Sequence, residues 1–261
     1  MRRLRVFLYN DPSTPNLRLD EVADYLKDLI ESSEVLIRPE FLHYHIGSDR
    51  RKLDDIARAI ASSRVIELYR RLSRRMPLLG EVEVEKRLIE SGSAVRGVMY
   101  DGYELADIYN RLIADVERDR SVVHVAFTSR LVGTFGEDGR YHARVIIASF
   151  PSIISTTGVV EAPAKPREFY LQISQVSDPS LQSILIEELK RKYAGRFIDY
   201  NDERLTEVMK GYVLQAVFYQ VFGEAFCDNR DCRLFNAHWQ EELIHSQIVS
   251  GKICDSHRAI L

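Results

Sequence analysis

The strongest constraint on the fold is the alternation of short apolar runs with segments whose apolar residues recur at helical spacing. Residues 4–9 (LRVFLY) form a β-prone run that ends at the turn-forming sequence Asn-Asp-Pro-Ser, and residues 17–33 then show helical spacing. A second short strand is expected at residues 35–37, before a proline. Strands that interleave with helices predict an α/β or α+β fold, in which helices flank a mixed sheet.

The first half of the chain continues this alternation. We predict one or two helices over residues 52–74 and a helix over residues 103–118, because apolar residues recur there at helical spacing. The intervening residues 80–90 (GEVEVEKRLIE) alternate acidic and apolar side chains, which favours an exposed strand or hairpin.

The second half adds two strands and several helices. Residues 122–128 and 141–150 predict a hairpin or two adjacent strands around the turn signals of GTFGEDGR. Residues 151–166, which contain three prolines, predict an irregular segment. Helices are expected over residues 181–193 and 204–223, and the second is apolar enough to pass through the core. No linker divides the chain, so we expect one domain over residues 1–261.

Charge and hydropathy exclude several broad classes of partner. The net charge of −3, from 36 basic and 39 acidic residues, gives no overall field that attracts nucleic acid or an anionic membrane. The N-terminal sequence MRRLRVFLYN lacks the apolar stretch and cleavage site of an export signal. We therefore expect a cytoplasmic protein that does not associate with membranes.

All three cysteines lie in the C-terminal segment, residues 224–261. Cys227, Cys232, Cys254 and His257 have the form C-x4-C, a 21-residue spacer, and C-x2-H. Structural zinc needs four such ligands, and two short-spaced pairs on either side of a helix supply them. A disulfide between the first two cysteines would leave Cys254 unpaired. We predict one structural Zn²⁺ at these four residues, with a helix over residues 236–249 that Asn236 caps.

This tail resembles the C-terminal half of the archaemetzincin-type zinc metallopeptidases, whose motif is HExxHxxGxxH-C-x4-C-x-M followed by C-x-x-C. In that family the histidines hold a catalytic zinc, the glutamate is the general base, and the cysteines hold a structural zinc. The resemblance implies a metzincin-like fold in which the C-terminal zinc site is kept, with His257 in place of the last cysteine.

The catalytic half of that motif is missing from this chain. The three histidine positions fall on Ala216, Gln220 and Phe226, and the glutamate falls on Val217. Only the glycine, Gly223, is kept. A metallopeptidase of this type needs an open zinc and a carboxylate that moves the proton. The residues at these positions cannot supply either group.

The whole chain is also similar to an archaeal family related to these peptidases. The similarity is carried by residues 128–170, from TSRLVGTFGEDG to AKPREFY, and by NAHWQEELIHSQ at 236–247. It implies that the strand over residues 141–150 corresponds to the strand that binds substrate in active relatives. We therefore expect a non-catalytic pseudoenzyme whose former cleft binds an extended peptide or protein by strand addition.

A divergent metallopeptidase or other hydrolase with a relocated metal site is the first alternative. His43 and His45 in EFLHYHIG would share one face of a strand, and His238 and His245 are two helical turns apart. The candidate ligands for such a site are His43, His45, His124, His142, His238 and His245.

A nucleic-acid-binding zinc protein is the second alternative. It draws on two clusters of arginines, Arg64, Arg70, Arg71, Arg74 and Arg75, and Arg230, Arg233 and Arg258 around the metal ligands. Tyr69 is the one aromatic residue within the first cluster, too few to stack successive bases, and acidic residues offset the second. Nucleic acid is therefore the least favoured partner.

Overall fold

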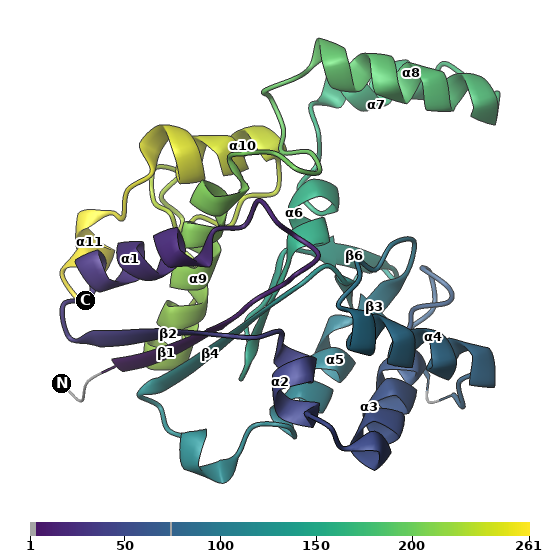
Figure 1. Cartoon of the computed structure of the whole chain (residues 1–261). Helices are drawn as coiled ribbons and strands as arrows, with labels where there is room; N and C mark the ends of the chain where they lie inside the picture. The colour runs from purple at the N-terminus through teal and green to yellow at the C-terminus, as the bar shows by residue number, and fades with distance from the viewer. Residues whose placement is uncertain (1–3, 74) are drawn as a thin grey trace.

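A five-stranded sheet forms the centre of the fold, with the strand order β2-β1-β4-β8-β7. The computed structural model describes residues 4–73 and 75–261, and Figure 1 shows helices on both faces of the sheet. Strands β2, β1, β4 and β8 are parallel, whereas β7 runs antiparallel to β8 at one edge. The strands are β1 (Leu4–Tyr9), β2 (Ser33–Arg38), β4 (Val122–Thr128), β7 (Ile146–Ile147) and β8 (Ser152–Ser155). The predicted mixed α/β class is confirmed.

A second sheet of three strands has the order β3-β5-β6. It consists of β3 (Met99–Asp101), β5 (Leu131–Phe135) and β6 (Tyr141–Arg144). The prediction that residues 122–128 pair with residues 141–150 is wrong, because β6 pairs with β5 and β4 belongs to the larger sheet. The turn signals of GTFGEDGR do close a hairpin, but its first strand is β5, which the sequence analysis missed.

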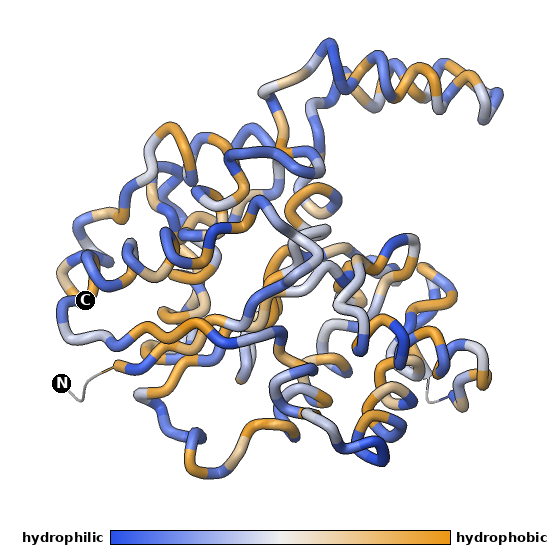
Figure 2. Tube along the Cα trace, viewed as in Figure 1, coloured by the Kyte–Doolittle hydropathy of each residue, from blue (hydrophilic) through white to orange (hydrophobic). Residues whose placement is uncertain are grey.

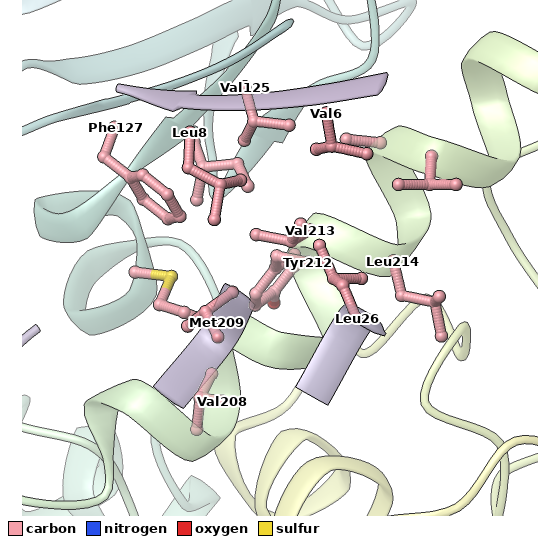
Figure 3. Close-up of a cluster of buried hydrophobic side chains, with 14 of the residues drawn as sticks. Val6, Leu8, Leu26, Val125, Phe127, Val208, Met209, Tyr212, Val213 and Leu214 are labelled. Carbon is pink, nitrogen blue, oxygen red and sulfur yellow. The ribbon is translucent and has the colours of Figure 1, made fainter. Parts of the chain in front are cut away.

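Alternate residues of the central strands face two separate cores. Val6 and Leu8 of β1 lie in the first core, together with α1 (Leu19–Leu29) and α9 (Leu205–Phe222). Figure 3 shows Val208, Met209 and Val213 of α9 among the side chains that fill this core. All three are fully buried, which confirms the prediction of a core helix over residues 204–223.

Phe7 and Tyr9 of the same strand face the second core, on the other side of the sheet. Four helices cover it: α2 (Phe41–Ile46), α3 (Arg50–Ser62), α4 (Leu79–Ser91) and α5 (Gly102–Asn110). Tubes coloured by hydropathy in Figure 2 show the central strands as largely apolar. Burial of apolar residues on both faces of the strands is typical of a sheet covered by helices on two sides.

Two strands predicted among the segments that cover the second core are in fact helices. Residues 80–90 belong to α4, because Val82, Glu85 and Ile89 share one buried helical face that the alternating pattern conceals. Residues 41–46 form α2, whose N-terminus is capped by the Glu40 carboxylate as it accepts a hydrogen bond from the backbone N–H of His43 at 2.7 Å.

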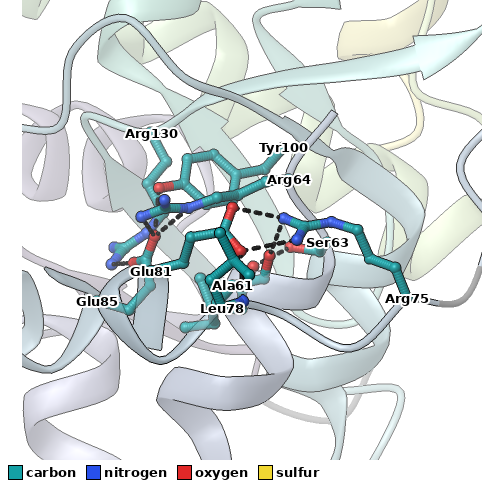
Figure 4. A network of polar contacts seen from close by, with 10 residues as sticks. Ala61, Ser63, Arg64, Arg75, Leu78, Glu81, Glu85, Tyr100 and Arg130 are labelled. Carbon is teal, nitrogen blue, oxygen red and sulfur yellow. Dashed lines mark hydrogen bonds and ion pairs between the residues drawn. The ribbon is translucent and has the colours of Figure 1, made fainter. Parts of the chain in front are cut away.

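A buried ionic network connects α4 to the two sheets (Figure 4). Glu85 is fully buried and accepts hydrogen bonds from Arg64, Arg130 and the Tyr100 hydroxyl at 2.6 to 3.0 Å. Burial raises the pKa of Glu85, but the charge of Arg130 and these hydrogen bonds outweigh that effect and hold the pKa below its ordinary value. Glu85 is therefore a carboxylate that two arginines compensate.

The segment between α3 and α4 departs from the prediction of helices over residues 52–74. Helix α3 ends at Ser62, and the described residues from 64 to 78 form no helix. Arg74 of the predicted basic cluster and residues 1–3 of the N-terminal sequence lie outside the described residues. Arg64 is buried against Glu85, so the basic cluster is not a continuous solvated helix face.

Residues 151–166 are ordered rather than irregular. Residues 152–155 form the buried strand β8, and α6 (Thr156–Glu161) follows it directly. The Ser155 hydroxyl oxygen caps α6 by accepting a hydrogen bond from the backbone N–H of Gly158 at 2.8 Å. This cap and the parallel pairing of β8 with β4 explain why the segment is regular.

Two helices project from the body of the molecule in Figure 1. They are α7 (Arg167–Ile173), which was not predicted, and α8 (Pro179–Lys192), which confirms the helix expected over residues 181–193. They share a small separate core of four buried residues: Phe169, Leu189, Tyr193 and Phe197. None of the described helices combines the length and apolar character needed to cross a membrane.

The C-terminal segment contains α10 (Gln240–Ile244), the π-helical turn η2 (His245–Ser250) and α11 (Asp255–Arg258). The prediction that Asn236 caps the helix is wrong, because α10 begins at Gln240 and Trp239 is its N-cap residue. Residues 238–240 instead lie beside Ala164, with hydrogen bonds of 2.8 Å between their backbones.

A short 3-10 turn, η1 (Asp115–Glu117), precedes β4.

Candidate metal centre and adjacent cleft

The four predicted metal ligands converge at the C-terminal end of α9. The ligand atoms of Cys227, Cys232, Cys254 and His257 all lie within 4.8 Å of one another. Cys254 and His257 lie on one helical turn, and their Sγ and Nδ1 atoms are 3.0 Å apart. Two short-spaced ligand pairs, separated by the α10 region, thus form one group that can hold a metal ion.

The sulfur separations fit a tetrahedral metal better than a disulfide. The Sγ atoms of Cys227 and Cys254 are 4.0 Å apart. A zinc ion with Zn–S bonds of about 2.3 Å separates two tetrahedral sulfur ligands by about 3.8 Å. A disulfide would require about 2.05 Å. Soft sulfur donors completed by one imidazole are a common ligand set for structural zinc.

The surroundings of the thiols favour a mixture of charge states before metal binds. Burial raises the pKa of Cys232 to about 12. Burial also acts on Cys254, but hydrogen bonds from His257 outweigh it and lower the pKa of Cys254 to about 7. Backbone N–H groups of Asn229 and Cys254 donate to the sulfurs of Cys227 and Cys232 at 3.4 and 3.5 Å. Such donors stabilise the thiolate form that binds metal.

Arg233 anchors the metal-binding loop to the core helix. Its side chain is 3% exposed, forms an ion pair with Glu207 of α9, and donates from Nε to the Gly251 carbonyl at 2.7 Å. The backbone N–H of Arg233 donates to the Lys252 carbonyl at 2.7 Å. One buried arginine therefore holds both ligand-bearing stretches against α9.

A cleft of about 350 Å³ lies beside this segment. One wall is the strip of residues 143–148, which contains β7, and another is α9 through Tyr212 and Gln215. Phe226 and residues 235–238 of the C-terminal segment also line it. The metal-binding segment thus contributes part of the cleft.

The backbone of β7 offers unpaired groups at the edge of the sheet. The Ser155 N–H donates to the Val145 carbonyl at 2.7 Å, and Ile146 lies opposite Ile154 in the ladder. In an antiparallel ladder, residues next to a hydrogen-bonded pair direct their N–H and C=O groups away from the partner strand. The polar groups of Ile146 therefore face the free edge, where a further strand can bind.

Two polar side chains in the buried middle of α9, Tyr212 and Gln215, face the cleft. Gln215 is 1% exposed, and its Nε2 donates to the Phe235 carbonyl at 3.3 Å. Its Oε1 has no hydrogen-bond partner among the described residues. The sequence analysis missed Gln215 and Tyr212, although two polar residues three positions apart in a buried apolar helix are a recognisable signal.

The positions that match the catalytic motif do not form a metal site. Ala216 and Val217 are fully buried in the first core. Gln220 is partly exposed, and Phe226 is exposed at the cleft. None of these side chains is an imidazole or a carboxylate, so this part of α9 lacks the groups with which a metzincin-type peptidase holds zinc and moves a proton.

The histidine positions of the relocated-site alternative are mostly separate. His43 is exposed and His45 is partly buried on α2, a helix, so the predicted shared strand face does not exist. His142 bonds to Asp138 at 2.8 Å, and His245 bonds to Asp231 at 2.6 Å. His238 precedes α10 at the cleft, so it does not share a helix with His245.

Only His45 and His124 meet, and they meet at the hydroxyl group of Tyr9. The His124 Nδ1 and the His45 Nε2 lie 2.9 and 3.1 Å from that oxygen, and Arg38 donates to it at 2.9 Å. Burial lowers the pKa of both histidines to about 4. Across residues 4–73 and 75–261, no other three His, Cys, Asp or Glu residues form a group that could hold a metal.

Most of the arginines invoked for nucleic acid binding are engaged by carboxylates. Arg64 and Arg233 are buried in ion pairs. Arg75 pairs with Glu81 at 2.7 Å, and Arg230 pairs with Glu242 at 2.8 Å. These pairs reduce the positive charge that a phosphate backbone could contact.

A comparison with models of protein families places these observations in context. Residues 2–261 match the model of the Probable metallopeptidase family (DUF6775). The chain belongs to this family. The match covers nearly the whole sequence, so the metallopeptidase relationship predicted from the tail extends to the chain as a whole. Neither the curated proteins nor the solved structures contain a match.

Proposed function

We propose that this member of the metallopeptidase family is a zinc-stabilised, non-catalytic protein that binds an extended peptide in the cleft beside β7. The observation that carries the proposal is that the possible metal site and the lining of the cleft come from different segments of the chain. The metal-ligating group lies in the C-terminal segment, whereas the cleft-lining part of α9 presents Tyr212 and Gln215 and no metal ligand. We also propose, as part of this function, that the chain is related to the archaemetzincin-type peptidases.

The metal in this proposal stabilises the structure. Cys227, Cys232, Cys254 and His257 would complete a closed tetrahedron around Zn²⁺, which leaves no open position for substrate or water. Such an ion supplies folding free energy, because the unfolded chain does not hold the ligands together. With the ion bound, these four ligands would fix the C-terminal segment against α9, and residues 235–238 of that segment would complete the cleft.

Peptide binding in this proposal uses the polar groups that the fold leaves unpaired. The N–H and C=O groups of Ile146 lie at the free edge of β7, and Gln215 Oε1 lies at the cleft without a donor. An extended peptide that adds as a strand supplies alternating donors and acceptors to such an edge. Among the described residues, no other group forms a hydrogen bond with Gln215 Oε1 or with the backbone groups of Ile146.

Metal content and peptide binding test the two parts separately. We expect one zinc per chain after chelator treatment, refolding with zinc and removal of excess metal; zero or two zinc ions would contradict the proposal. A library of extended peptides should yield ligands that are not cleaved. Methylation of the alternate backbone nitrogens that face β7 should abolish binding, because it removes the donors of an added strand, whereas methylation of the other alternate set should be tolerated. Binding that survives methylation of each of the two sets would exclude strand addition.

A hydrolase with a relocated metal is the second candidate. The convergence of His45 and His124 on Tyr9 favours it, but Arg38 donates to the same oxygen and places a positive charge where a cation would bind. Zinc-dependent cleavage of a peptide that disappears in both His45→Ala and His124→Ala, while the fold is kept, would favour this candidate over the first.

A further inference from the structure

The cleft is lined by positive charge and not by negative charge. No aspartate or glutamate is present among the described residues that line it, and Arg144 is the one lysine or arginine there. A cleft without carboxylates and with a permanent positive charge favours an anionic ligand over a cationic one.

Arg144 is oriented but not neutralised. It lies at the end of β6, and its Nε donates to the Thr134 hydroxyl oxygen at 2.8 Å. Thr134 is largely buried at 7% exposure, so it holds the guanidinium plane in one direction. The Nη atoms of Arg144 form no ion pair or hydrogen bond with the described residues, unlike those of Arg64 and Arg233. A guanidinium group in this state presents two parallel donors that match a carboxylate.

Other polar atoms that line the same cleft match the backbone of a peptide. Gln215 is buried with its Oε1 unpartnered, and the Nε2 bond to the Phe235 carbonyl fixes the orientation of the amide. That oxygen needs an N–H donor, and the free edge of Ile146 needs both a donor and an acceptor. Amide groups in an extended chain provide both, whereas a small inorganic anion provides no donor.

We infer that the cleft selects extended peptides that bear a carboxylate, which Arg144 binds as a specificity-determining residue. The inference rests on the proposed peptide-binding function and adds the chemical class of the ligand. The carboxylate has two sources, the side chain of an aspartate or glutamate within the peptide and the free C-terminus of the peptide.

Four synthetic peptides of equal length separate these sources, with the zinc-loaded full-length protein as the binder. The first has internal glutamates and an amidated C-terminus, and the second has glutamines and a free C-terminus. The third has glutamines and an amidated end, and the fourth has lysines and an amidated end. Fluorescence anisotropy measures each Kd. We expect the first or the second peptide to bind about threefold to tenfold more tightly than the third, since Arg144 is exposed but can form a bidentate, charge-assisted pair with a carboxylate. We expect the fourth to bind most weakly.

Arg144→Gln should remove this preference, so that the peptide preferred by the wild type binds no more tightly than the third peptide. Arg140→Gln is the matched control, because Arg140 lies on the same hairpin, pairs with Asp138 at 2.8 Å and does not line the cleft. It removes the same formal charge and should keep the preference. Arg144→Lys should retain part of the preference, since a lysine keeps the charge but lacks the paired donors.

The outcomes distinguish the inference from the function on which it rests. If all four peptides bind equally well, or if Arg144→Gln and Arg140→Gln weaken the first peptide equally, carboxylate selection is wrong while peptide binding stands. If no peptide of any charge binds, both the proposed function and this inference are wrong. A preference that only Arg144→Gln removes supports both.

Discussion

The hydroxyl group of Tyr9 lies 2.9 Å from Nδ1 of His124, although the two residues are 115 positions apart in the sequence. Parallel pairing of β1 with β4 brings them together, and Arg38 donates to the same hydroxyl oxygen. Burial holds the pKa of His124 at about 4, below its ordinary value of 6.5. The imidazole is therefore neutral in the folded protein at neutral pH.

This burial predicts a loss of stability in acid. Because the folded-state pKa of His124 is lowered, its contribution is complete above pH 6.5 and is lost as the pH falls towards 4, where the unfolded chain binds the extra proton. The full loss is about 3 kcal/mol. In His124→Gln, which cannot titrate, urea unfolding at pH 7.5 and 4.5 should show a smaller decrease than in the wild type. Equal decreases would show that His124 has the same pKa in the folded and unfolded states, which would contradict the prediction.

Removal of zinc should destabilise the protein through its C-terminal segment. We expect a chelator to lower the Tm of the wild type by several degrees, because the ion binds the folded state much better than the unfolded one. Cys232→Ser, which alters a fully buried ligand, should start from the lower Tm and no longer respond to chelator. Ser256→Ala on exposed α11 is the control and should behave as the wild type. A wild-type Tm that chelator does not change would contradict a structural ion.

The carboxylate of Glu85 should be among the most important single groups for stability. Glu85→Gln leaves Arg64 and Arg130 without a compensating charge in the second core, which should cost about 3 to 5 kcal/mol of unfolding free energy. Glu83→Gln is the matched control on the same helix, because Glu83 pairs with Lys86 at the surface and its loss should cost at most about 1 kcal/mol. Urea unfolding at pH 7 measures both. A cost for Glu85→Gln no larger than that of the control would contradict the importance of the network.

Gly158 should link the packing of α6 to the geometry of the cleft. A Cβ atom at this position would lie 2.3 Å from the carbonyl oxygen of Arg144, which is a backbone atom that cannot move without the strand. Gly158→Ala should therefore cost about 1 to 3 kcal/mol, as overpacked substitutions do, and should weaken peptide binding. Gly80→Ala in α4 meets no atom within 4 Å and should be neutral or slightly stabilising. Unfolding midpoints and peptide Kd values of the two variants provide the comparison.

Local signals in the sequence were sufficient for the elements whose environment is simple. Residues 4–9 and 205–222 are buried on most sides, and their composition alone predicts a central strand and a core helix. The same holds for the metal ligands, because their spacing is a property of one short segment. Convergence of Cys227 and His257 needed only the intervening chain to fold back.

The remaining features depend on partners that are distant in the sequence. The alternating pattern of residues 80–90 conceals a helix because Glu85 points into the core, where Arg64 and Arg130 compensate its charge, and no local pattern reveals those partners. β6 pairs with β5 rather than β4 because β4 belongs to the five-stranded sheet and β5 to the three-stranded sheet, an assignment that depends on contacts between distant segments. A cleft along residues 141–150 was predicted, but the part that Gln215 plays in its lining was not, since Gln215 meets the edge strand only in the folded molecule.

Residues 235–238 belong both to the cleft and to the stretch of chain between the two pairs of metal ligands. An ion that joins Cys232 to Cys254 closes this stretch into a ring and restricts the conformations of that cleft wall. Occupancy of the metal centre and occupancy of the cleft are then thermodynamically linked, and each ligand must raise the affinity for the other by the same factor. Under the proposed function, the supply of zinc would thus set the affinity of the cleft for a peptide.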